Sequence, residues 1–133
     1  MPLRWVRSDS DYVLGVNQIS DGTVRFIALC TLLYQDNSPS SIVIDEPELG
    51  LHPYAINILS DLFRSTSEKT QLIISTQSTG ILDNMKPEDI IIFDYINGKN
   101  IIDRPDQQFL EMWLDEYSMS EAWRKNLIGA RSR

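Results

Sequence analysis

The sequence predicts an α/β fold in which a mostly parallel sheet is flanked by helices. Two short apolar runs, Ser41–Asp45 and Gln71–Ser75, have the length and composition of buried strands. Stretches with helical spacing of apolar residues, over 21–34 and 54–65, precede each of these runs. A third apolar run, over 90–95, continues the alternation. Strands that alternate with helices favour parallel pairing, because each helix returns the chain to the end of the sheet at which the previous strand began.

Local signals justify the ends of the two long helices. The hydroxyl of Ser20 can cap the first helix, and the segment Asp36-Asn37-Ser38-Pro39 breaks it. The loop before the second helix contains Pro47, Gly50 and Pro53.

Shorter elements are predicted on both sides of this core. Asn97-Gly98 is a hairpin turn signal that leads from the third strand to Ile101-Ile102. The same spacing rules predict a short strand over 12–16, a brief helix over 79–84, and two amphipathic helices over 107–115 and 118–127.

The composition is that of a small soluble domain or of a piece of a larger protein. The chain has 133 residues, of which 42% are hydrophobic, enough for one core. The net charge of −7 repels phosphate backbones, so the chain is a poor candidate for a surface that grips DNA. Cys30, the single cysteine, is interpreted as a buried packing residue. The apolar runs are too short to cross a bilayer and no secretory signal is found, so we expect a cytoplasmic protein.

Two adjacent carboxylates, Asp45 and Glu46, stand where the first strand ends. Active residues lie at the carboxyl ends of parallel strands, and Gln77 follows the end of the next strand. Asp45 can hold Mg²⁺ through its water shell, because this hard cation prefers oxygen ligands. Glu46 can orient and deprotonate an attacking water. The structural alternative is an ordinary turn, since adjacent acids before a proline are common there. Glu48 is assigned only a supporting role in the loop.

Three further motifs have both a functional and a structural interpretation. Ser20-Asp21-Gly22-Thr23 places a hydroxyl and several N–H groups at the positive end of a helix, which suits an anion, although alone it is a routine capped start. The amide of Gln77 can donate to a γ-phosphate and accept from water, but it cannot carry a proton; the alternative is a polar loop residue. His52, the only histidine, is interpreted as a loop or interface residue rather than a metal ligand.

In their order along the chain, these motifs resemble the C-terminal half of the RecF/SMC-like, AAA-type ABC ATPases. The resemblance implies a half domain of the three-layer P-loop NTPase type over residues 1–133. It covers about residues 12–129, including a tail over 116–123 that is similar to the closing helix of stand-alone members. The motif segments are 19–26 for the signature, 45–53 for Walker B and the D-loop, and 75–78 for the switch.

The resemblance implies a nucleotide site shared by two subunits of a homodimer. Ser20, Asp21 and Gly22 would contact the γ-phosphate of ATP carried by the opposite subunit. Gly50 and His52 would lie in the D-loop, which meets the partner subunit. The cofactors implied are ATP and Mg²⁺.

The resemblance also implies roles in hydrolysis. Asp45 would hold Mg²⁺, and Glu46 would be the catalytic base. Gln77 stands where most relatives carry a switch histidine, which affects the catalytic rate more than the fold.

The sequence lacks a P-loop, since it contains no Gly-x-x-x-x-Gly-Lys-Ser/Thr segment. The chain alone is therefore expected not to hydrolyse ATP, and a Walker A-containing half from the same protein or a separate chain would complete it. Relatives act in DNA repair, chromosome maintenance and phage defence, some with nucleases, so the resemblance implies DNA or a nuclease as a candidate partner of the full system. Two alternatives stay open: a non-catalytic dimerisation module, and a magnesium-dependent phosphoesterase built from Asp45, Glu46 and Glu48.

Overall fold

A computed structural model describes residues 4–6, 9, 11–105 and 117–125. The chain consists of two compact units, residues 1–77 and 78–133. The predicted helix over 107–115 lies outside the described residues, as does the end of the helix predicted over 118–127. Within the described part, no helix combines the length and the apolar character that spanning a membrane requires.

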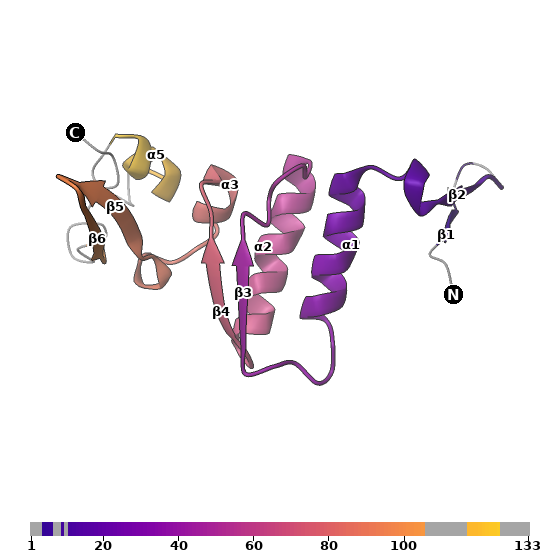
Figure 1. The fold of residues 1–133 in the computed structure, drawn as a ribbon, viewed down its shortest axis with the longest axis horizontal. Coiled ribbons are helices and arrows are strands. Elements are labelled where there is room, and N and C mark those ends of the chain that lie inside the picture. The colour runs from indigo at the N-terminus through magenta and orange to yellow at the C-terminus, as the bar shows by residue number, and fades with distance from the viewer. Residues whose placement is uncertain (1–3, 7–8, 10, 106–116, 126–133) are drawn as a thin grey trace. The chain divides into compact units, whose positions relative to one another are not determined.

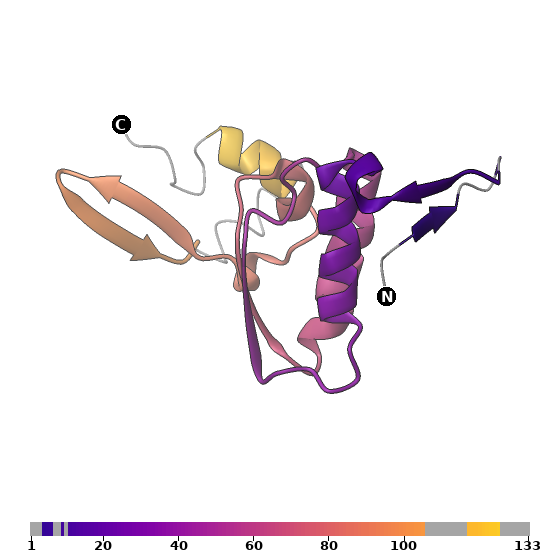
Figure 2. The same ribbon diagram turned by 45° about the vertical axis from the view of Figure 1, so that its right-hand side comes forward.

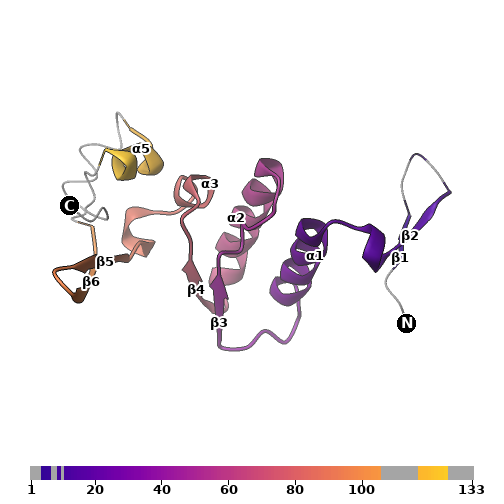
Figure 3. The same cartoon turned by 45° about the horizontal axis from the view of Figure 1, so that its top comes forward.

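The first unit is built around two parallel strands and two helices (Figure 1). Strands β3 (Ser41–Asp45) and β4 (Gln71–Ser75) have the predicted bounds and pair in parallel. Helix α2 (Pro53–Ser67) contacts both β4 and helix α1 (Asp21–Leu33). It therefore lies between the strand pair and α1 (Figure 3).

One face of the strand pair and one stripe of α2 form the core of this unit. Along β3, Ile42 and Ile44 are buried while Val43 is 73% exposed, because successive side chains of a strand point to opposite faces. Helical spacing buries a stripe of α2 that consists of Leu59, Leu62 and Phe63.

Capping side chains determine where both helices begin. The Oγ of Ser20 accepts a hydrogen bond from the N–H of Thr23 at 3.2 Å, which confirms the predicted cap. The Nδ1 of His52 accepts from the N–H of Tyr54 at 3.2 Å. Helix α2 starts at Pro53, one residue earlier than predicted, because proline fits the first helical position.

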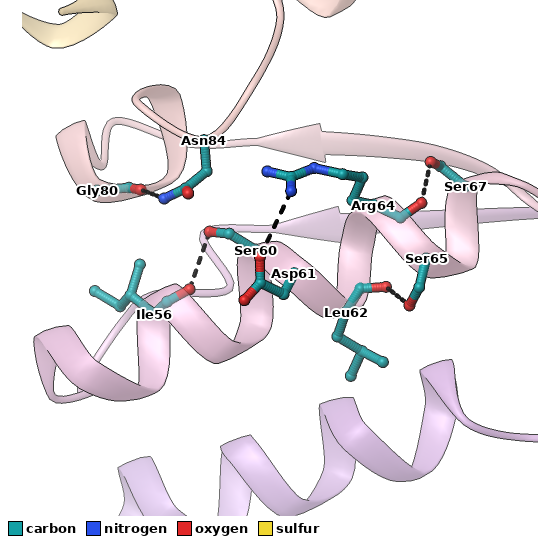
Figure 4. Close-up of polar contacts among 9 residues, drawn as sticks. All are labelled: Ile56, Ser60, Asp61, Leu62, Arg64, Ser65, Ser67, Gly80 and Asn84. Carbon is teal, nitrogen blue, oxygen red and sulfur yellow. Dashed lines mark hydrogen bonds and ion pairs between the residues drawn. The ribbon is translucent and has the colours of Figure 1, made fainter.

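Polar side chains inside α2 form contacts local to the helix (Figure 4). The buried hydroxyl of Ser60 donates to the carbonyl oxygen of Ile56 at 2.9 Å. On the exposed side, Arg64 and Asp61 form an ion pair at 3.7 Å, an arrangement that contributes little in water.

An antiparallel strand pair precedes α1. It consists of β1 (Arg4–Val6) and β2 (Val13–Gly15), and the 3₁₀-helix η1 (Val16–Gln18) follows. The strand predicted over 12–16 is therefore confirmed at its centre and ends one residue earlier, at Gly15.

The second unit contains an antiparallel hairpin and short helices. Strand β5 (Ile92–Ile96) pairs with β6 (Lys99–Asp103), as Figure 2 shows. The predicted hairpin is confirmed, since β5 and β6 pair antiparallel within this unit. The reason is the turn at Asn97 and Gly98, whose φ values of 53° and 80° fold β6 directly back onto β5. The helices are α3 (Thr79–Leu82), shorter than predicted, η2 (Pro87–Asp89) and α5 (Met119–Arg124).

Asp83, directly after α3, joins that helix to α5 within this unit. Its Oδ1 accepts from the N–H of Ser120 at 2.7 Å, and its Oδ2 accepts from the Ser120 hydroxyl at 2.9 Å. Ser118 and Glu121 form a capping box that starts α5. The buried apolar residues beside this contact are Ile90, Met119 and Ala122.

Candidate functional site

The predicted site residues of β3 and β4 meet at one edge of the strand pair. Asp45 lies opposite Ser75, and the Ser75 hydroxyl donates to Oδ1 of Asp45 at 2.6 Å. The N–H of Glu46 donates to the carbonyl oxygen of Ser75 at 2.9 Å. Open α/β sheets bind ligands at this edge, outside the carboxyl ends of their strands. The predicted placement of Asp45 and Glu46 is confirmed, and their chemical roles stay predictions.

The backbone of Glu46 adopts a left-handed conformation. Its φ of 42° costs a residue with a Cβ about 1–3 kcal/mol. Two donors reach its carbonyl oxygen: Nη1 of Arg25 at 3.0 Å and the N–H of Leu49 at 3.2 Å. Arg25 belongs to α1, so a neighbouring helix supports the strained turn. Sequence reasoning missed this residue, because a charged side chain on a helix is usually solvated and nothing in its spacing indicates a distant carbonyl.

The Glu48 side chain contacts the segment that follows β4. Its Oε1 accepts from Oγ1 of Thr76 at 2.6 Å and from the N–H of Gln77 at 3.3 Å. Its Oε2 is buried and has no hydrogen-bond partner among the described residues. The side chain of Gln77 is exposed. Glu48 is predicted to have a supporting role in the loop, and the group that it contacts is the segment that carries Gln77.

Two glycines bring the start of α1 against the loop after β3. A Cβ added at Gly22 would overlap the carbonyl oxygen of Gly50 and lie 2.9 Å from its carbonyl carbon. Gly50 has a φ of 77°, which glycine adopts without steric cost. The hydroxyls of Ser20 and Thr23 lie 2.8 Å apart beside this contact. Asp21 is exposed in the first helical turn, where its carboxylate interacts favourably with the helix dipole.

His52 and Cys30 occupy structural positions. His52 is exposed and caps α2, as befits a loop residue. Cys30 is half-buried in α1, and burial raises the pKa of its thiol. A thiol that stays protonated is a poor nucleophile, so a packing role suits Cys30.

The donors at this edge suit a magnesium ion that keeps most of its waters. The carboxylate of Asp45 and the hydroxyl of Ser75 are hard oxygen donors, and Mg²⁺ is often held by one or two carboxylates together with substrate phosphates. Among the described residues, no three His, Cys, Asp or Glu side chains form a group that could hold a metal. Of the three acids of the phosphoesterase alternative, Glu48 bonds the segment after β4.

Comparisons with known proteins identify the family to which the chain belongs. Residues 2–83 match the family described as "AAA domain, putative AbiEii toxin, Type IV TA system". The Old nuclease of Escherichia phage P2 is 37% identical over 87 residues, which cover 57% of this chain. The match covers only 15% of the length of that nuclease.

Two solved structures share the fold. One, from work on ATP-driven dimerisation and DNA-stimulated activation of SMC ATPases, has a TM-score of 0.63 at 18% identity and covers 79% of this chain and 65% of that one. The other, an SMC head bound to the C-winged helix domain of ScpA, has the same TM-score and identity over 74% of this chain and 31% of that one. These likenesses confirm the predicted α/β fold of the P-loop NTPase type. Because the family match spans more than half of the sequence, the chain belongs to this AAA-domain family and carries part of an ABC/SMC-like ATPase fold.

Proposed function

We propose that this chain is the signature, Walker B and switch part of an ABC-class ATPase, which hydrolyses ATP at a dimer interface once a P-loop half completes it. The proposal is carried by the edge at which Asp45 and Glu46 lie beside the segment Ser75–Gln77. Hydrogen bonds from Ser75 to Asp45 and from Gln77 to Glu48 hold this edge together. P-loop NTPases need this combination of a metal-holding carboxylate and groups that orient a water.

Each residue of the edge has a separate task in the proposed reaction. Mg²⁺, when bound, neutralises charge that develops on the β- and γ-phosphates. Asp45 holds the ion through water, and Glu46 accepts the proton of the attacking water. The side-chain amide of Gln77 donates to the γ-phosphate and accepts from the same water. Because that amide cannot take up a proton, we expect slower turnover than a histidine would permit.

The start of α1 is the proposed site for the γ-phosphate of a second subunit. The first N–H groups of a helix have no partners within it and attract anions, so the backbone of Asp21 and Gly22 and the hydroxyl of Ser20 are suitable donors. The loop with Gly50 and His52 is the proposed contact with that subunit. Beside it, Leu49 and Tyr54 are 57% and 71% exposed, and they supply apolar surface for an interface.

The strand pair itself supports completion by another half. Parallel strands are normally covered on both faces, yet Val43 and Ile73 are 73% and 52% exposed on the face opposite the core. In the described part of the chain, β3 and β4 have only each other as strand neighbours. A P-loop half from the same protein or a separate chain would cover this face and supply the phosphate-binding loop that the sequence lacks.

A role in DNA maintenance or phage defence is the wider proposal. It is supported by the similarity to a phage nuclease and to SMC ATPases whose activation is stimulated by DNA. The net charge of −7 argues that any DNA is engaged by another part of the full system, which we place in the cytoplasm.

ATP binding and hydrolysis by the chain alone and with a P-loop half test the proposal. We expect hydrolysis only in the completed protein. There, Glu46→Gln should retain ATP binding and lower turnover by about 100-fold or more, because only the general base is lost. Glu68→Gln is the matched control: it makes the same chemical change at the exposed C-cap of α2 and should leave turnover unchanged.

Two results would redirect the proposal. Normal turnover in Glu46→Gln would remove this residue from the role of base. Dimerisation without any ATP hydrolysis in the completed protein would support the alternative, a non-catalytic interaction module.

A further inference from the structure

The last residue of β4 and the two residues that follow it are each hydrogen-bonded to a carboxylate, either at the end of β3 or three residues beyond it. Ser75 donates to Asp45, while Thr76 and Gln77 both donate to Glu48. We infer that Glu48 is a positioning residue that fixes the backbone at Gln77, so that the exposed amide of Gln77 is held ready for the γ-phosphate. This inference rests on the proposed ATPase function.

The backbone of Glu48 is itself fixed, which makes it a suitable anchor. The N–H of Leu49 donates to the carbonyl oxygen of Glu46 at 3.2 Å, and the N–H of Leu51 donates to that of Glu48 at 2.9 Å. The first bond closes a turn over residues 46–49 and the second a turn over residues 48–51, so Glu48 belongs to both turns. From this anchored position, the carboxylate reaches the segment after the neighbouring strand.

Of the two bonds that Glu48 accepts, the one from Thr76 is short at 2.6 Å and the one from Gln77 is longer at 3.3 Å. Hydrogen bonds to an ionised carboxylate are about twice as strong as those between neutral groups. Gln77 lies just beyond the last paired residue of β4, so the ladder between β3 and β4 no longer holds it. Its N–H instead donates to Glu48. This bond holds the backbone two residues beyond the end of β4.

Asp45 cannot perform this task during the proposed reaction. Its Oδ1 accepts from Ser75, but the same carboxylate is proposed to hold Mg²⁺ and its waters, which compete for that oxygen. Glu48 bonds different residues, Thr76 and Gln77, and leaves the metal to Asp45. A separate carboxylate therefore keeps Gln77 in place while the metal site fills and empties.

The contact is tested first in the 133-residue chain, without nucleotide. Amide hydrogen exchange at Gln77 reports the bond to Glu48 directly. We expect Glu48→Ala to accelerate exchange at Gln77 by about tenfold or more. Glu48→Gln should give an intermediate rate, because its amide oxygen still accepts both bonds without a charge. Glu68→Gln should leave exchange at Gln77 unchanged. Unchanged exchange in Glu48→Ala would overturn the inference.

The catalytic consequence is tested in the protein completed by a P-loop half. We expect Glu48→Ala to lower kcat by about 10- to 100-fold, as misplacement of a reacting group by about 1 Å does, with the Kd for ATP within about twofold. Glu48→Gln should recover part of kcat, which a loss of folding would not allow. If the wild type hydrolyses ATP and Glu48→Ala matches it, the inference fails and the proposed function stands. If the wild type shows no hydrolysis, the proposed function fails and the role of Glu48 in it falls as well.

Discussion

Gly22→Ala tests whether the start of α1 and the loop after β3 are packed as closely as the structure shows. The added methyl would overlap the carbonyl oxygen of Gly50 and lie 2.9 Å from its carbonyl carbon, closer than the 3.0 Å that real Cβ contacts respect. Both atoms belong to the backbone, so no rotamer change relieves the overlap. Gly50 has a φ of 77°, in the left-handed region, which limits how far its backbone can move away from the added methyl group.

The magnitude follows from two opposing terms. Overpacking against a fixed neighbour costs about 1–3 kcal/mol, and replacing glycine by alanine in a helix returns up to about 1 kcal/mol. The overlap is with backbone, so we expect the cost to prevail, with a net loss of about 1–2 kcal/mol. For a unit of this size, the loss corresponds to a Tm lower by about 5–10 °C.

Thermal unfolding followed by circular dichroism measures this loss, and Gly15→Ala is the matched control. Gly15 has a φ of −80°, and among the described residues a Cβ added there meets only Oε1 of Gln18, at 3.8 Å. We expect its stability to change by less than about 0.5 kcal/mol. A Gly22→Ala variant as stable as Gly15→Ala would refute the close approach of α1 to the loop.

Three further predictions concern the start of α1, the contact of Asp83 with α5 and the cap of α2. In the completed protein, Ser20→Arg should abolish ATP-dependent dimerisation measured by light scattering, because a bulky side chain would fill the proposed trans phosphate site; dimerisation that survives the change would argue against that contact. Asp83→Ala should destabilise the second unit by about 2 kcal/mol, because two charge-assisted bonds from Ser120 are lost; amide exchange in α5 measures this, and unchanged protection would show that Asp83 does not anchor the helix. His52→Ala should cost α2 about 0.5–1 kcal/mol through loss of the bond to Tyr54, and a urea titration that matches wild type would discount that cap.

The sequence by itself determined the elements whose signals are local. The bounds of β3 and β4, the Ser20 cap and the Asn97-Gly98 turn all follow from short-range spacing and backbone preference. The sequence also predicted that Asp45 and Glu46 stand at the end of a strand, because parallel strands present their carboxyl ends at a common edge.

Only the tertiary structure decided which groups these residues meet. No periodicity indicates that Arg25 reaches the carbonyl oxygen of Glu46, or that Glu48 accepts from Thr76 and Gln77. Such contacts depend on where separate elements meet in space, whereas a spacing pattern reports only the face on which a residue lies.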